Sequence, residues 1–258
     1  MIIPTSIIGA YVIAFIMTFV VPIVLVIILA IRHKIDLVAL GMGFASFFVS
    51  QILLRIPLLK FAGTQQWFLS FTTHKFVYLL FLCLTAGLFE ESGRLCGGLL
   101  LKKHRSYRAV LSFGLGHAFC EMILLVGITH LSNILLAISF NEGGTLASRL
   151  SPSVAQQTKD ALMLATPSMI SAGILERVSA TFFHLFATTL VFIGIVRHKI
   201  GWYFLAIGAH TGFDLLAVFT SKIGIWPTEL LLFTLSLVGL WFVWTSRNRF
   251  VPAQAKVN

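Results

Sequence analysis

Seven long apolar runs separated by short polar connections dominate the sequence. A helix needs roughly 20 apolar residues to cross a hydrocarbon core about 30 Å thick, and each run is long enough to do so. With 58% hydrophobic and 11% charged residues and a mean hydropathy of +0.95, the composition of the 258-residue chain excludes a water-soluble globule. We predict an all-α, polytopic transmembrane helix bundle that forms a single domain over residues 1–258, with spans at about 7–31, 38–59, 76–101, 110–131, 167–196, 200–219 and 229–244.

Lys and Arg are shared unevenly between the connections. They are dense at residues 32–34, 102–108, 197–199 and 247–256, and sparser at 60–75, 149–159 and 222. Because cytoplasmic loops carry the excess of Lys and Arg, we predict an external N-terminus, a cytoplasmic C-terminus and an external loop at Ser139–Ala161. The basic residues lie between spans and form no continuous stripe, so the net charge of +10 indicates topology and no nucleic-acid partner is expected.

Five of the nine acidic residues fall in the interior of predicted spans. A carboxylate at the bilayer centre costs about 2.5–3.5 kcal/mol on insertion scales, so these residues are expected to have partners and a function. Basic side chains stand beside them in the sequence, mostly three or four residues away, a spacing that shares a helix face. The acidic residues are Glu90, Glu91, Glu121, Glu176 and Asp214, and the candidate partners are Arg94, Arg177, His117 and His210.

Four helices bring polar side chains to one depth. Glu90, His117, His184 and His210 stand 9–13 residues from the nearest Lys or Arg of the predicted cytoplasmic connections. At about 1.5 Å per residue, their depth is roughly 14–20 Å, which is close to the middle of the membrane. We therefore predict a shared polar cavity inside the bundle.

Three short motifs follow one another on the third, fourth and sixth predicted spans: Glu90–Arg94 (EESGR), Phe113–His117 (FGLGH) and His210–Asp214 (HTGFD). Their order resembles that of the CAAX-processing and bacteriocin-processing intramembrane protease superfamily. With a Glu-Arg pair and a further histidine between the last two motifs, the chain looks like the bacterial YhfC-type branch, which is described as intramembrane metalloproteases. Two positions depart from the superfamily pattern: Arg94 follows the Glu pair after two residues instead of three, and Asp214 replaces an Asn.

The resemblance implies an intramembrane endopeptidase in a bacterial plasma membrane, acting on membrane-embedded or membrane-associated polypeptides. It implies that Glu90 is the general base for a captured water, with Glu91 and Arg94 maintaining the charge of the pair. His117 would position this water or shuttle its proton, and His210, oriented by Asp214, would face the substrate carbonyl. The predicted catalytic residues are Glu90, Glu91, Arg94, His117, His210 and Asp214, and the predicted supporting residues are Glu121, Glu176, Arg177 and His184.

Alternatives to this mechanism and to this function stay open at the level of sequence. His117, His184 and His210 together with a glutamate could hold one divalent metal such as zinc, which would activate the water directly. A proton- or metal-ion-coupled transporter would also place Glu, His and Asp at the middle of the membrane. Polar pairs can also serve only to hold membrane helices together.

The predicted topology can be tested by cysteine labelling in sealed vesicles. In a variant without its native cysteines, residues introduced at Ser106 and Ser153 are expected to react from opposite sides, because the first lies in a Lys- and Arg-rich connection and the second in the predicted external loop. Labelling of both from the same side would show that the number of spans between them is wrong.

Overall fold

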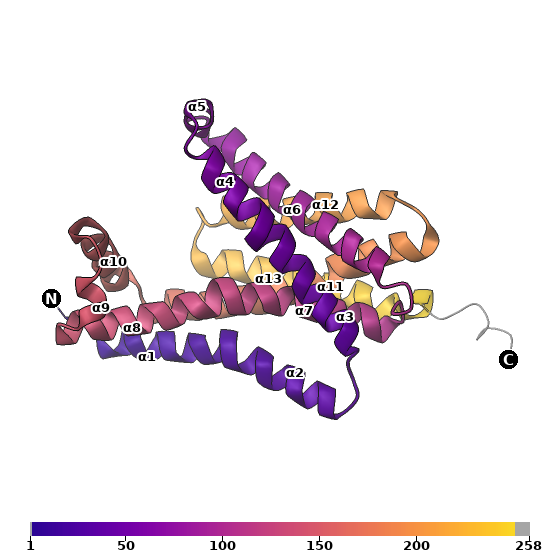
Figure 1. Cartoon of the computed structure of the whole chain (residues 1–258), viewed down its shortest axis with the longest axis horizontal. Coiled ribbons are helices and arrows are strands. Elements are labelled where there is room, and N and C mark those ends of the chain that lie inside the picture. Colours follow the sequence, from indigo (N-terminus) through magenta and orange to yellow (C-terminus); the bar gives the residue numbers. More distant parts are fainter. Residues whose placement is uncertain (1, 251–258) are drawn as a thin grey trace, which may run out of the picture. The chain divides into compact units, whose positions relative to one another are not determined.

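A computed structural model describes residues 2–250, and every regular element in that range is helical. Figure 1 shows the course of the chain. The helices are α1 Thr5–Phe15, η1 Ile16–Val20, α2 Val21–Ile31, α3 Leu37–Phe47, η2 Phe48–Arg55, α4 Ile56–Ala62, α5 Gln66–Thr72, α6 Lys75–Leu100, α7 Tyr107–Glu121, η3 Met122–Gly127, α8 Ile128–Glu142, α9 Thr145–Ser148, α10 Pro152–Leu164, α11 Pro167–Arg197, α12 Gly201–Thr220, α13 Ile225–Thr245 and η4 Arg247–Phe250.

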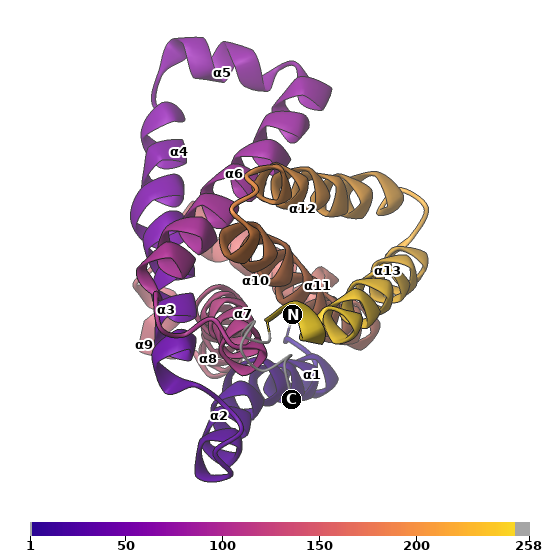
Figure 2. The ribbon, with the colours of Figure 1, turned by 90° about the vertical axis from the view of Figure 1, so that its right-hand side faces the viewer.

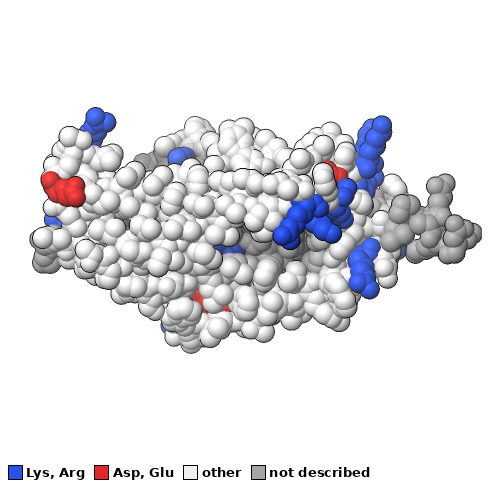
Figure 3. All heavy atoms as spheres, turned by 90° about the horizontal axis from the view of Figure 1, so that it is seen from below, with Lys and Arg blue, Asp and Glu red and all other residues white. Residues whose placement is uncertain are grey.

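Seven continuous helices are long and apolar enough to cross a membrane, which confirms the predicted fold class. Their exposed side chains are mostly apolar, and few charged residues appear on the face shown in Figure 3. The fourth helix, Tyr107–Glu142, continues 11 residues beyond the predicted end of that span at residue 131. Just beyond that position, Ser132 donates its hydroxyl proton to the carbonyl of Ile128 one turn earlier, so its polar group has a partner within the helix.

Wide π-helical turns interrupt three of the spans, at η1, η2 and η3. Such turns often occur at functional sites. The polar segment predicted as an external loop is itself largely ordered, since it contains the end of α8, the short helix α9 and most of α10. The side of the membrane on which it lies stays a prediction.

The chain divides into two compact units, and the expectation of a single transmembrane domain stays a prediction. The first unit comprises Met1–Ile28 and Glu121–Arg177. Here α1 packs against α8 around a core that includes Ile7, Ala14 and Ile134. The side chain of Asn141 accepts a hydrogen bond from the backbone of Ile3 at 2.7 Å and donates one to it at 2.9 Å.

The second unit comprises Leu29–Cys120 and Val178–Asn258. Helix α6 packs against both α12 and α3, as the two ribbon views show (Figures 1 and 2). On α7, Phe113 meets Phe192 of α11 edge-on, with ring centroids 5.2 Å apart. Both rings also lie against α6, since a Cβ added to Gly97 would lie 3.0 Å from the ring of Phe113 and one added to Gly98 would lie 3.2 Å from that of Phe192.

Two glycines allow α3 and α7 to approach with backbones in contact. A Cβ added to Gly43 would lie 1.9 Å from the carbonyl oxygen of Phe113, and one added to Gly116 would lie 2.0 Å from that of Leu40. Only hydrogen fits at either position, as is common where membrane helices pack closely. This contact sets the position of His117, the residue after Gly116.

The entry to α3 is fixed by Asp36, which caps the helix by accepting hydrogen bonds from the amides of Val38 and Ala39 at 3.1 Å. Its second carboxylate oxygen lies 2.6 Å from Nδ1 of His104. Burial alone would raise the pKa of Asp36, but the hydrogen bonds from His104 and the two amides hold this pKa below its ordinary value. The carboxylate is therefore ionised and anchors the start of α3.

The close approach of α3 and α7 predicts that Gly43→Ala lowers the thermal stability of the purified protein, by about 1–3 kcal/mol in free energy of unfolding, because the methyl group overlaps a backbone carbonyl. Gly41→Ala is the matched control on the same helix, since its added Cβ meets nothing within 4 Å. It is expected to leave stability unchanged or raise it. Equal effects of the two substitutions would contradict the packing.

Candidate active site

Six of the ten predicted site residues meet inside the second unit. Glu90, Glu91 and Arg94 come from α6, His117 from α7, His184 from α11 and His210 from α12. Glu91, Arg94 and His117 are fully buried, and the other three are at most 6% exposed. The depth argument from sequence therefore selected residues that lie together.

Glu90 is at the centre of this group. Its Oε2 lies 3.1 Å from Nε2 of His117, 3.8 Å from Nε2 of His210 and 4.0 Å from Nδ1 of His184. One carboxylate oxygen is thus surrounded by a nitrogen from each of three histidines. On the far side of its ring, His117 places Nδ1 3.4 Å from the hydroxyl of Ser46, which fixes the ring between two polar partners.

Two residues of η2 complete the surroundings of Glu90, and the sequence reasoning missed both. Gln51 donates from Nε2 to Oε1 of Glu90 at 3.1 Å, and its own carbonyl oxygen accepts from Nη1 of Arg55 at 3.2 Å. Arg55 also donates to the carbonyl of Leu82 at 2.7 Å and to Thr85 at 3.3 Å. The sequence did contain a signal for them: Gln51 and Arg55 are polar residues four positions apart inside an apolar span, where a polar side chain is expected to have a partner.

Glu91 contacts both Arg94 and His210. It forms an ion pair with Arg94, three residues further along α6, and its Oε1 lies 2.7 Å from Nδ1 of His210. A carboxylate only accepts, so Nδ1 of His210 carries the proton and Nε2 faces Glu90. Asp214, the predicted orienting partner, lies 3.8 Å from Nε2 of His210, further away than Glu91.

The other predicted supporting residues belong to the first unit. Arg177 donates to Glu121 at 2.7 Å and also pairs with Glu176. The partner proposed for Glu121 from helical spacing was His117, but the geometry pairs Glu121 with Arg177 and His117 with Glu90. Glu121, Glu176 and Arg177 therefore form a separate ion-pair group.

A metal ion could be held by Glu90, His117 and His184, because each offers a ligand atom and these atoms lie within 4.8 Å of one another. The predicted ligands were His117, His184 and His210 together with a glutamate, and this group contains two of those histidines and Glu90 but not His210. Two histidines and a glutamate, with a water in the fourth position, form one of the known catalytic zinc sites. The chemistry of the donor set therefore fits zinc.

One contact restricts when this set can bind metal. Arg94 lies with Nη2 2.6 Å from Nδ1 of His184. A guanidinium can only donate, so this contact uses the lone pair of Nδ1, and the proton of the neutral ring is on Nε2. Neither nitrogen of His184 then has a lone pair for a metal, so binding through His184 requires Arg94 to move away.

Charged and imidazole side chains buried among apolar spans define the class of protein: a polytopic membrane protein with an intramembrane Glu–His centre. The chain belongs to the YhfC intramembrane metalloprotease family, whose model matches residues 17–232.

A relative among curated proteins is the "Uncharacterized membrane protein YhfC" of Bacillus subtilis (strain 168), 32% identical over 157 residues. The match covers 58% of this chain, which spans about three fifths, 59%, of the length of that relative. No solved structure matches the chain. The family and the seven apolar helices are consistent with a bacterial plasma membrane.

The contact between Arg94 and His184 predicts that Arg94→Lys raises the affinity of the purified protein for Zn²⁺, by about tenfold or more. Lysine keeps a cation near Glu91 but lacks the planar fork that reaches two partners, so His184 regains its lone pair. Competition with a chromogenic chelator measures this affinity.

Arg177→Lys is the matched control, since Arg177 pairs with Glu121 and Glu176 in the first unit, outside the Glu–His centre. Its affinity for Zn²⁺ is expected to equal that of the wild type. An equal rise in both variants would mean that replacing an arginine by a lysine raises the affinity for Zn²⁺ at any position, so that the lone pair of His184 does not control metal binding.

Proposed function

We propose that this chain is an intramembrane endopeptidase that hydrolyses peptide bonds of membrane-embedded or membrane-associated polypeptides, with Glu90 as the base that activates water. The observation that carries the proposal is the environment of Glu90: Gln51 holds one carboxylate oxygen, and the nitrogens of three histidines surround the other. Membership of a family described as intramembrane metalloproteases supports the same reaction.

Glu90 is suited to accept a proton because its orientation is fixed before a substrate arrives. Gln51 donates to Oε1 and is itself held by Arg55, so Oε2 stays directed at the histidines. A general base contributes about 10²–10⁴-fold when it is held within reach of the proton that it removes. His117 lies 3.1 Å from the same oxygen, so it can relay that proton towards the leaving amine.

His210 and Arg94 provide the positive charge that peptide hydrolysis requires on the carbonyl side. Glu91 holds Nδ1 of His210, and as an imidazolium His210 would donate from Nε2 to the developing oxyanion. Arg94 balances Glu91 through their ion pair. Asp214 lies near enough to stabilise the imidazolium electrostatically, at 3.8 Å. In this assignment Asp214 acts on His210 and makes no direct contact with the oxyanion.

Glu90, His117 and His184 would hold a metal in the loaded protein. When bound there, Zn²⁺ would lower the pKa of its water and so supply hydroxide near neutral pH, while Glu90 would act as a ligand instead of as the base. Arg94 would then remain with Glu91, and His210 would keep its hydrogen bond to that carboxylate. The residues that position the substrate carbonyl are therefore the same with and without metal.

The base assignment predicts that Glu90→Gln lowers the cleavage rate of a membrane-peptide library by about 10²–10⁴-fold, while the protein still inserts and purifies normally. An amide keeps the shape of the side chain but cannot accept the proton. Glu142→Gln, the same change at an exposed carboxylate at the end of α8, is the control and is expected to cleave normally.

His117→Ala is expected to impair cleavage as strongly as Glu90→Gln, and the double variant should be little worse than either, because both residues act on one proton transfer. Near-normal cleavage by Glu90→Gln would remove the base assignment. If the wild type cleaves nothing but Glu90→Gln stops ion flux into vesicles, the function is transport.

A further inference from the structure

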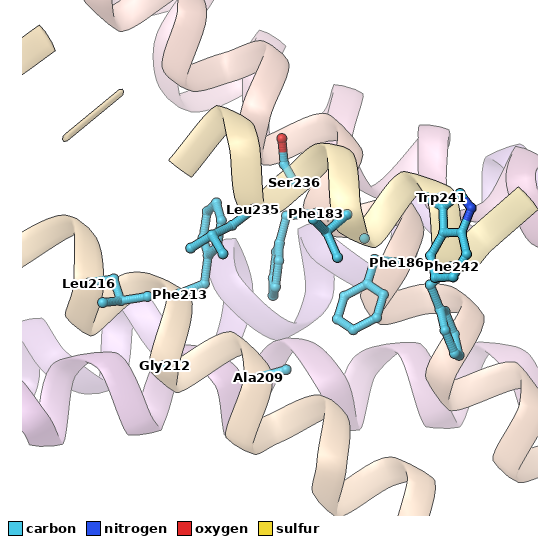
Figure 4. A pocket seen from close by; sticks show the side chains of 12 residues that line it. Phe183, Phe186, Ala209, Gly212, Phe213, Leu216, Leu235, Ser236, Trp241 and Phe242 are labelled. Carbon is cyan, nitrogen blue, oxygen red and sulfur yellow. The ribbon is translucent and has the colours of Figure 1, made fainter. Parts of the chain in front are cut away.

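An apolar pocket of about 580 Å³ lies between α11, α12 and α13. Figure 4 shows the side chains that line it, mainly aromatic and aliphatic. Ser236 contributes the only hydroxyl among them, and it donates to the carbonyl of Phe233 in its own helix at 2.8 Å. The volume is in the range of small-ligand sites, and the lining is suited to an apolar guest.

The pocket and the Glu–His centre share a wall at Phe183. Its ring meets the imidazole of His210 edge-on with centroids 5.3 Å apart, and it stacks on Phe213 at 4.4 Å. His184, the next residue along α11, belongs to the centre. A group in the pocket therefore lies one ring away from two of the three histidines.

Helix α12 contributes residues to the pocket from one face and to the Glu–His centre from the adjacent face. Ala209, Gly212 and Phe213 line the pocket, at a spacing that keeps them on one side of a helix. His210, one residue after Ala209, instead contacts Glu91 of α6. Helix α11 is divided in the same way, with Phe183 in the pocket lining and His184 in the Glu–His centre. The two sites therefore share two helices, which fix the position of one site relative to the other.

We propose that this pocket receives a large apolar side chain of the membrane-inserted peptide substrate, one or two residues from the scissile bond. The inference rests on the proposed protease function. A peptide whose carbonyl reaches His210 can place a neighbouring side chain against Phe183, because consecutive Cα atoms are 3.8 Å apart and the two rings are separated by 5.3 Å. The shared wall thus favours a peptide side chain over a lipid acyl chain as the occupant.

The pocket can be filled without disturbing its walls. A Cβ added to Gly212 meets nothing within 4 Å and Gly212 lines the pocket, so Gly212→Trp is designed to fill the pocket with an indole ring. Gly208, one turn earlier on α12, is equally unobstructed but is exposed and lies outside the lining. Gly208→Trp is therefore a control of the same size on the same helix.

The experiment uses synthetic single-span peptides with leucine or alanine at successive positions around the cleavage point, in liposomes containing the full chain. Gly212→Trp is expected to lower the ratio of kcat/KM for leucine over alanine peptides at least about tenfold at one position, the size of effect that a few methylenes in a pocket produce. Gly208→Trp should leave this ratio unchanged. Equal ratios in both variants and the wild type would overturn the proposal.

A binding measurement separates this inference from the protease assignment. Peptides that carry a diazirine-bearing leucine are crosslinked to the Glu90→Gln variant, and the attachment site is mapped by mass spectrometry. Attachment to the pocket residues of α12 and α13 supports the pocket, and if the wild type nevertheless cleaves no peptide, only the protease assignment fails. Attachment of a photoreactive phospholipid acyl chain there, with peptides attaching elsewhere, would overturn the pocket proposal.

Discussion

Two adjacent carboxylates on a membrane-spanning helix must be compensated within the bundle, and this requirement organises the second unit. Glu91 is fully buried and Glu90 is 6% exposed, so water can solvate neither adequately. Their charges are met by Arg94 from the same helix and by polar groups from four other elements. Because an unpaired buried charge is strongly destabilising, the helices that carry these partners cannot move away independently.

The partners reach Glu90 and Glu91 only because the helices approach closely. Gly43 and Gly116 bring α3 and α7 into backbone contact next to His117. Gly87 plays the corresponding part between α6 and α12, since an added Cβ there would lie 3.1 Å from the carbonyl oxygen of Ile207 and 3.2 Å from Cβ of His210. Small residues thus set interhelical distances at which side-chain hydrogen bonds can form.

The same packing lets each of two helices contribute side chains to both the Glu–His centre and the apolar pocket. Helices α11 and α12 each present a histidine to the Glu–His centre and a phenylalanine to the neighbouring apolar pocket, where Phe183 and Phe213 stack. A polar centre and an apolar pocket can therefore adjoin on the same two helices. Peptide hydrolysis within a membrane needs both, because water must be held for the reaction while the substrate side chains are apolar.

The sequence by itself determined the seven apolar helices, because span length is fixed by membrane thickness. It also selected Glu90, His117, His184 and His210, which meet in one site, since distance along a helix converts directly into depth. Depth does not specify the direction in which a side chain points around the helix. Only the tertiary structure therefore decided that His117 contacts Glu90 and not Glu121, that Glu91 holds His210, and that Gln51 joins the site.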